Sequence, residues 1–165
     1  MNNTRLIFAA TSVALGLLLT ACGAGSDEPE PTPALATLTV SAATNSTFNG
    51  VYSSTALNLS EVLKVNPVGG EPEVCSFRFS GLQRAGGSTM DGDIRYLPGT
   101  NTVHVIFVSI GGVEFNTRSR TNAAVDRPNH EVDLNGIVLT ASTGVVSTIT
   151  LNGSVPMRTN RPEGC

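Results

Sequence analysis

The side chains that most often act as metal ligands or general bases are scarce in this sequence. It contains two histidines, His104 and His130. His104 lies between Val103 and Val105 in an apolar run, a context typical of a hydrogen-bonded residue on a sheet, whereas His130 follows Pro128 in a segment typical of a turn. A zinc site needs three or four ligands in a defined geometry, and two separated histidines do not supply them. We therefore predict no metal site.

The carboxylates and hydroxyls also lack a catalytic arrangement. Asp91-Gly92-Asp93 offers two carboxylates, but the other oxygen ligands and the distal glutamate of a calcium loop are absent around it. On a strand, Asp91 and Asp93 share one face, which we expect to be solvated. No serine lies in a Gly-x-Ser-x-Gly motif. We predict that the protein is not an enzyme and has no catalytic residue and no cofactor. The alternative is a hydrolase without a recognisable motif.

Cysteine is the third residue type whose side chain could take part in chemistry. Among the cysteines, Cys22 has the most informative surroundings. It follows Leu19-Thr20-Ala21 at the end of an apolar run, residues 6–19, that begins after Arg5. A positive residue, a short apolar stretch and small residues before a cleavage point form a secretory signal. The run is shorter than the ~20 residues that span a bilayer. The arrangement resembles the lipobox of bacterial lipoproteins, which implies cleavage before Cys22 and acylation of that cysteine. A plain signal peptide or a short membrane anchor is the alternative.

The residues after Cys22 bear on where the protein is held. Gly23 follows the cysteine, where an aspartate in Gram-negative lipoproteins commonly signals retention in the inner membrane. For a Gram-negative source, the resemblance therefore implies the periplasmic face of the outer membrane. Residues 22–36 are rich in Gly, Pro and Glu, and we expect them to form a tether of roughly 20 Å as a flexible coil or roughly 45 Å when extended. Residues 37–165 then form a single domain.

The charge of the chain excludes a basic binding surface. Loss of Arg5 with the signal peptide changes the formal net charge from −3 to −4. Because the only lysine is Lys64, the domain lacks the basic footprint of a nucleic-acid-binding protein. Arg118, Arg120 and Arg127 gather in the segment 118–130, which we expect to be a solvated loop. A contact with an anionic partner is the alternative.

Cys75 and Cys165 remain after the lipidation site is assigned. In an oxidising compartment two remaining cysteines most often pair, so we predict a disulfide between them. The bond would close a loop of about 90 residues and stabilise the fold by ~4–5 kcal/mol through the entropy of the unfolded chain. Two free thiols, or an intermolecular bond through Cys165, are the alternatives.

From about residue 37 the hydrophobic pattern has the period of two that is typical of half-buried antiparallel strands. Cys75, Phe77 and Phe79 alternate with polar residues, and so do Ile149 and Leu151. The predicted strands lie near residues 37–41, 47–53, 57–65, 74–82, 90–97, 102–110, 113–118, 131–142 and 145–157. Residues 102–110 are apolar on both faces, which indicates a strand covered on both sides. Residues 57–65 also have some helical spacing, and a short helix there is the alternative.

Glycines indicate how the strands are joined. Gly111-Gly112 is a strong signal for a two-residue hairpin turn, Pro98-Gly99 suits a turn in a longer loop, and Thr143-Gly144 suggests a second tight hairpin. Around that second turn, two copies of a Leu-Asn-Gly motif, 134–136 and 151–153, would face each other. Asn135 would then pair with Asn152, and each glycine would leave room for the opposite leucine.

These signals predict an all-β domain. An antiparallel meander of eight or nine strands in a small closed or partly open barrel is the first choice, and a two-sheet β-sandwich is the alternative. Phe48-Asn49-Gly50-Val51-Tyr52 resembles the opening strand of lipocalin-like barrels, with tyrosine where tryptophan is usual. The resemblance covers five residues and carries no site residue across.

The expected function follows from the anchor and from the lack of catalytic motifs. We expect a non-catalytic outer-membrane lipoprotein whose β-domain is a binding or interaction module in the cell envelope. The expected partners are the membrane, through the lipid on Cys22, and an envelope protein or a small apolar ligand. A lipocalin-like carrier of an apolar ligand is the alternative, and it requires an interior larger than its side chains fill.

Overall fold

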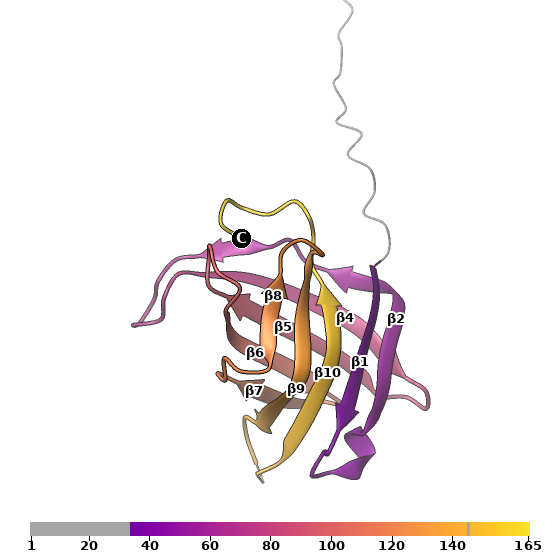
Figure 1. Ribbon diagram of the computed structural model, residues 1–165. Coiled ribbons are helices and arrows are strands. Elements are labelled where there is room, and N and C mark those ends of the chain that lie inside the picture. Colours follow the sequence, from indigo (N-terminus) through magenta and orange to yellow (C-terminus); the bar gives the residue numbers. More distant parts are fainter. Residues whose placement is uncertain (1–33, 145) are drawn as a thin grey trace, which may run out of the picture. The chain divides into compact units, whose positions relative to one another are not determined.

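The computed structural model describes residues 34–144 and 146–165, and within them the chain forms ten strands and one short 3-10 helix (Figure 1). The strands are β1 (Ala34–Ser41), β2 (Gly50–Leu59), β3 (Leu63–Val65), β4 (Val74–Arg84), β5 (Thr89–Tyr96), β6 (Val103–Ile110), β7 (Val113–Thr117), β8 (Ala123–Asp126), β9 (Glu131–Ala141) and β10 (Thr148–Pro156). The helix η1 (Ser46–Phe48) connects β1 to β2. The predicted signal peptide, Cys22 and most of the tether lie outside the described residues.

Eight of the described strands close into an antiparallel barrel. Going round the ring, the order is β1, β2, β4, β5, β6, β7, β9, β10, and the ring closes because β10 pairs with both β9 and β1. Neighbours in the ring follow one another along the chain, apart from the two extra strands β3 and β8. The predicted up-and-down barrel is therefore confirmed in its closed form, and the sandwich alternative is excluded.

The two extra strands each pair with part of a ring strand that its ring neighbour leaves unpaired. β2 pairs with the second half of β4, and the last pair is Leu59 with Phe79. β3 pairs with the beginning of β4, where Leu63 lies opposite Ser76 and Val65 opposite Val74. Residues 57–65 thus form strands with a break at 60–62, so the helix alternative is wrong. On the other side of the barrel, β7 pairs with the end of β9 and β8 with its beginning.

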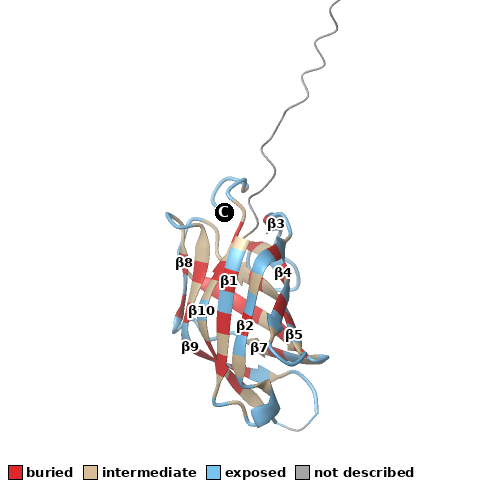
Figure 2. Ribbon diagram, turned by 90° about the vertical axis from the view of Figure 1, so that its right-hand side faces the viewer, coloured by how far each residue is buried: buried red, intermediate tan, exposed pale blue. Residues whose placement is uncertain are grey.

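The barrel interior is filled by side chains. Alternate residues along the strands are buried, which Figure 2 shows as alternating bands. Cys75, Phe77 and Phe79 point inward, as the alternation predicts, and Ile149 and Leu151 do so as well. The largest fully buried side chains are Tyr52, Tyr96, Phe77, Phe79, Phe115, Leu38, Leu82, Met90, Ile94, Ile106, Ile110 and Leu134. These aromatic and branched side chains form one continuous core.

The connection between β9 and β10 differs from the predicted tight hairpin. Asn135 does pair with Asn152, but nearer the turn the register is displaced by one residue, and Leu151 pairs with Ile137. Gly136, at φ +77°, is the additional residue and forms a bulge there. β9 ends at Ala141 and β10 begins at Thr148, and the amide of Ser142 donates its hydrogen to the backbone oxygen of Glu114 on β7. The prediction of a two-residue turn was therefore wrong. The predicted pairing was right for the part of the hairpin farther from the turn, from Asn135–Asn152 onward.

The other glycine turn is confirmed. Ile110 of β6 pairs with Val113 of β7, and both intervening glycines have positive φ values, +57° at Gly111 and +82° at Gly112. Such a turn suits the twist of an antiparallel hairpin. At the same end of the barrel, Phe48 from η1 packs edge-on against Phe115, with ring centroids 5.5 Å apart. This contact covers the core at that end.

Candidate functional site

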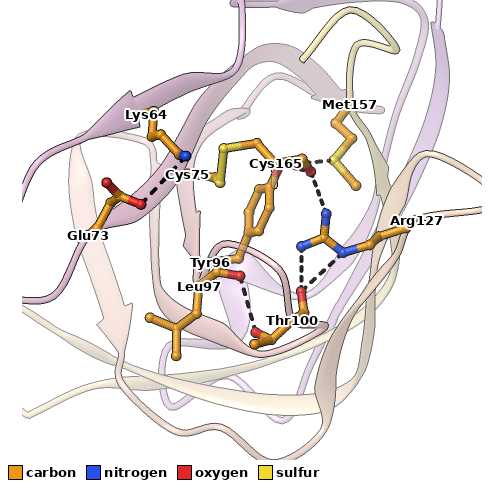
Figure 3. Close-up of a disulfide and its surroundings, with 9 residues drawn as sticks. All are labelled: Lys64, Glu73, Cys75, Tyr96, Leu97, Thr100, Arg127, Met157 and Cys165. Atoms are coloured by element: carbon orange, nitrogen blue, oxygen red, sulfur yellow. Dashed lines mark hydrogen bonds and ion pairs between the residues drawn. A yellow bond between two sulfur atoms is a disulfide. The ribbon is translucent and has the colours of Figure 1, made fainter. Parts of the chain in front are cut away.

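The end of the barrel where β1 begins is covered by the C-terminal segment, residues 157–165 (Figures 1 and 2). Cys75 of β4 and Cys165 form the predicted disulfide, with a Cα–Cα distance of 5.6 Å. The Tyr96 hydroxyl donates a hydrogen bond of 2.9 Å to the backbone oxygen of Cys165, and Arg127 donates one of 2.8 Å to the same oxygen (Figure 3). Burial raises the pKa of Tyr96, which keeps this donor protonated. Both cysteines are buried, so the bond is structural.

The arginine-rich segment 118–130 is only partly the solvated loop that its composition predicted. Residues 123–126 form β8, with Ala123 and Val125 buried. Arg127 contacts Cys165 and Thr100 and lies 5.7 Å from the centre of the Tyr96 ring. Arg120 is exposed, as predicted. β8 reads Ala-Ala-Val-Asp, so its burial alternates without an alternation of polar and apolar residues, which is why the pattern did not indicate this strand.

The loop between β3 and β4, residues 66–73, reaches over the outer face of the barrel and is called the flap here. Glu71 of the flap accepts a hydrogen bond of 3.0 Å from Arg118, and its carboxylate lies 2.7 Å from Nε2 of His104 on β6. The hydrogen bonds from Arg118 and then His104 lower the pKa of Glu71 to about 2. His104 is 8% exposed. It is the hydrogen-bonded sheet residue that the sequence predicted.

The first half of β6 is buried on both of its faces. Val105 pairs with Arg95 on the outward side of the wall, yet it is 3% exposed and does not belong to the interior core. Val74, at the base of the flap, is buried in the same way outside that core. The prediction of a doubly covered strand is therefore confirmed for the part of β6 nearest the flap.

The most prominent hollow of the described residues is an open groove on the outer wall. It has a volume of about 640 Å³ and crosses β4, β5 and β6. The lining residues are Asn58, Ser60, Arg78, Phe79, Ser80, Asp91, Gly92, Asp93, Arg95, Phe107, Val108, Ser109 and Glu114. Most of these side chains belong to the outward-facing set of each strand. We refer to this surface as the outer groove.

Irregular pairing shapes the wall beneath the outer groove. The register of β4 against β5 shifts between Phe79 and Leu82, and Gly81, at φ +92°, lies in the shifted stretch. Gly92, on the facing strand, has no room for a side chain, since a Cβ there would lie 2.5 Å from the Phe79 ring. The Asp91 carboxylate accepts a hydrogen bond of 3.0 Å from the amide of Gly81. Bulges of this kind bend a strand locally, and here the bend lies at the groove.

Asp93 is the electrostatic centre of the outer groove. It accepts hydrogen bonds from the Ser76 hydroxyl at 3.1 Å and from Arg95 at 3.2 and 3.3 Å, and Arg78 lies 3.6 Å away. The guanidinium of Arg95 also lies 5.1 Å from the centre of the Phe107 ring. Asp91 and Asp93 do share a face, as predicted. Asp93, however, is 15% exposed and ion-paired, so its predicted full solvation was wrong.

Several polar groups of the groove remain available to a ligand. Among the described residues, the side chains of Asn58, Ser80 and Ser109 make no hydrogen bond to the protein. Arg78 touches Asp93 through Nε and is 77% exposed, which leaves its outer nitrogens facing solvent. The groove therefore offers hydroxyl, amide and guanidinium groups at one open surface.

A second hollow adjoins the first. Its volume is about 610 Å³, and it is lined by residues of β2 and β4, among them Asn58 and Ser80, which also line the outer groove. It lies where β2 and β4 lose their pairing between Ser53 and Asn58. The two hollows share Asn58 and Ser80 and so lie next to each other across β6, β5, β4 and β2.

The sequence did not indicate the outer groove, because its residues are dispersed among ordinary strand positions. The one usable signal was Asp91-Gly92-Asp93, which places a glycine between two carboxylates in a strand. No group of three or more histidine, cysteine, aspartate or glutamate side chains in the described part of the chain is arranged to hold a metal ion. Within the same residues, no helix is long and apolar enough to cross a membrane.

Comparisons with known proteins assign no family to this chain. Neither a family profile, nor a curated protein, nor a solved structure matches it.

Proposed function

We propose that the protein is an outer-membrane lipoprotein, anchored through Cys22, whose barrel is a non-catalytic binding module of the cell envelope. The observation that carries the proposal is the contrast between the two sides of the barrel wall. The inner side is occupied by the packed core, whereas the outer side bears an open groove of about 640 Å³ lined by both polar and apolar groups. Binding at the outer wall needs no rearrangement of the core.

The lipid anchor is supported by the lipobox-like sequence before Cys22 and by the disulfide, since disulfides form and persist in exported proteins. A covalent lipid with more than one chain holds a protein firmly at a membrane. The tether then keeps the barrel at a high local concentration near its envelope partner, which strengthens a weak interaction.

The carrier alternative is less well supported. A carrier of an apolar ligand needs empty space inside the barrel. Here the interior is occupied by core side chains, among them Tyr52, Phe77, Phe79 and Tyr96. The hydrolase alternative would draw on Asp93, which is the carboxylate held most tightly in the outer groove. Two arginines neutralise it, an arrangement better suited to fixing a surface than to moving a proton.

A photo-crosslinking experiment in cells tests the proposal. A benzophenone amino acid replaces Ser109 in the outer groove, or Val138 on β9 outside it, in the full-length chain. Val138 is a suitable control because it is 51% exposed and belongs to a strand that does not line the groove. We expect an adduct of defined mass from position 109 and none from position 138. Equal adducts from both positions, or none from either, would contradict binding at the groove.

A further inference from the structure

The shape and lining of the outer groove also narrow its ligand. We propose that it binds an uncharged oligosaccharide chain, an inference that rests on the proposed function and names its substrate class. Three observations carry it: the open form of the groove next to the second hollow, the chemistry of its free side chains, and its lack of the features that other polymers require.

The form suits a chain rather than a compact small molecule. Pockets for small ligands are mostly apolar and enclose most of the ligand surface. The outer groove is open, it combines polar groups with a larger apolar surface, and it adjoins the second hollow of about 610 Å³ at Asn58 and Ser80. A ligand that follows this path lies across four strands and keeps one side in solvent.

The lining suits a ligand rich in hydroxyl groups. Ser80, Ser109 and Asn58 supply groups that both donate and accept hydrogen bonds, and Arg78 supplies guanidinium donors. A sugar hydroxyl is likewise both donor and acceptor, so it pairs with any of them. Phe107 is partly exposed beside them, and it offers the apolar CH face of a sugar ring a surface to pack on.

The outer groove is less suited to a polyanion, to a peptide strand or to a protein partner. The ionisable lining residues are Arg78 and Arg95 against Asp91, Asp93 and Glu114, two positive and three negative charges, so a polyanion is disfavoured. A peptide that adds a strand needs a free sheet edge, but β5 at the centre of the groove is paired on both sides. A protein partner usually inserts an apolar anchor into a buried pocket, and the outer groove is open rather than buried.

Titration of the barrel with defined oligosaccharides tests this inference. The protein is residues 31–165, which contain every described strand, the core and the disulfide. The probes are chitohexaose and maltohexaose, with oligogalacturonate as the charged comparison, and binding is followed by amide NMR shifts. We expect a neutral probe to bind more tightly than oligogalacturonate, with shifts at Gly92 and Ser109. Arg78→Ala should weaken that binding about tenfold, the effect of a hydrogen bond to a charged group.

Matched controls separate the outcomes. Arg120→Ala removes another exposed arginine, outside the groove, and should leave the affinity unchanged. Equal losses for both arginine variants would overturn the assignment of the groove. If no neutral oligosaccharide binds while the benzophenone at position 109 still captures an envelope component, the ligand class is wrong and the proposed function stands. If both experiments fail, both proposals fall.

Discussion

At the scale of single residues, one glycine fixes how closely two strands of the barrel approach. Gly153 of β10 has φ +127°, and a Cβ at this position would collide with the backbone oxygen of Thr37 on β1. Gly153 lies opposite Leu134, as the sequence predicts. The residue that needs the space, however, is on the other neighbouring strand. Gly153 therefore permits the contact through which the barrel closes.

A pair of substitutions isolates that close approach. Gly153→Ala should lower the free energy of unfolding by more than 2 kcal/mol, as a rough estimate that adds overpacking to backbone strain. Gly87→Ala is the control, because Gly87 has a similar φ of +122° with no atom near the site of its Cβ. It should cost about 1 kcal/mol from strain alone. Denaturant unfolding measures both, and equal losses would show that closure does not depend on Gly153.

Glu71 makes the flap sensitive to acid. Its pKa in the folded protein is about 2, below its ordinary value of 4.5, so the ionised carboxylate stabilises the folded state. That contribution is complete above pH 4.5 and is lost as the pH falls towards 2. Wild type should therefore be more stable than Glu71→Gln at neutral pH, and the difference should vanish near pH 2. Unfolding curves measured across this range test the sign, with Glu61→Gln as the control.

At the scale of strands and loops, the alternation of residues predicted most of the barrel. Cys75, Phe77 and Phe79 alternate clearly because β4 has one buried and one exposed face. The residue pattern is uninformative in two places. β8 alternates in burial but reads Ala-Ala-Val-Asp, with no alternation of polar and apolar residues, and Ser142 leaves its hairpin to bond with β7. The groove could not be predicted, since it depends on which strands become neighbours.

The disulfide holds the C-terminal segment, and the effect of removing this bond on stability can be estimated. The double variant Cys75→Ala, Cys165→Ala frees a loop of 90 residues, so the free energy of unfolding should fall by ~2–5 kcal/mol. The hydrogen bonds from Tyr96 and Arg127 to Cys165 should weaken with it. Hydrogen exchange at residues 157–165 should rise more than exchange in β9 or β10. Unchanged stability and exchange would show that the segment is held without the bond.

At the scale of the whole molecule, the barrel is packed within and covered at its ends. Phe48 packs on Phe115 at one end, and residues 157–165 lie over the other. The face left for a partner is the outer wall, where irregular pairing around Gly81 and Gly92 hollows the sheet. We therefore place the proposed binding outside the barrel, on its outer wall.

Native mass spectrometry of the protein purified from membranes tests this account most directly. The predicted spectrum contains a chain that begins at Cys22 and carries the mass of a diacylglyceryl and an acyl group, with no apolar molecule retained in the interior. A stoichiometric apolar ligand would contradict the filled barrel and favour the carrier. An unmodified N-terminus at another residue would contradict the anchor.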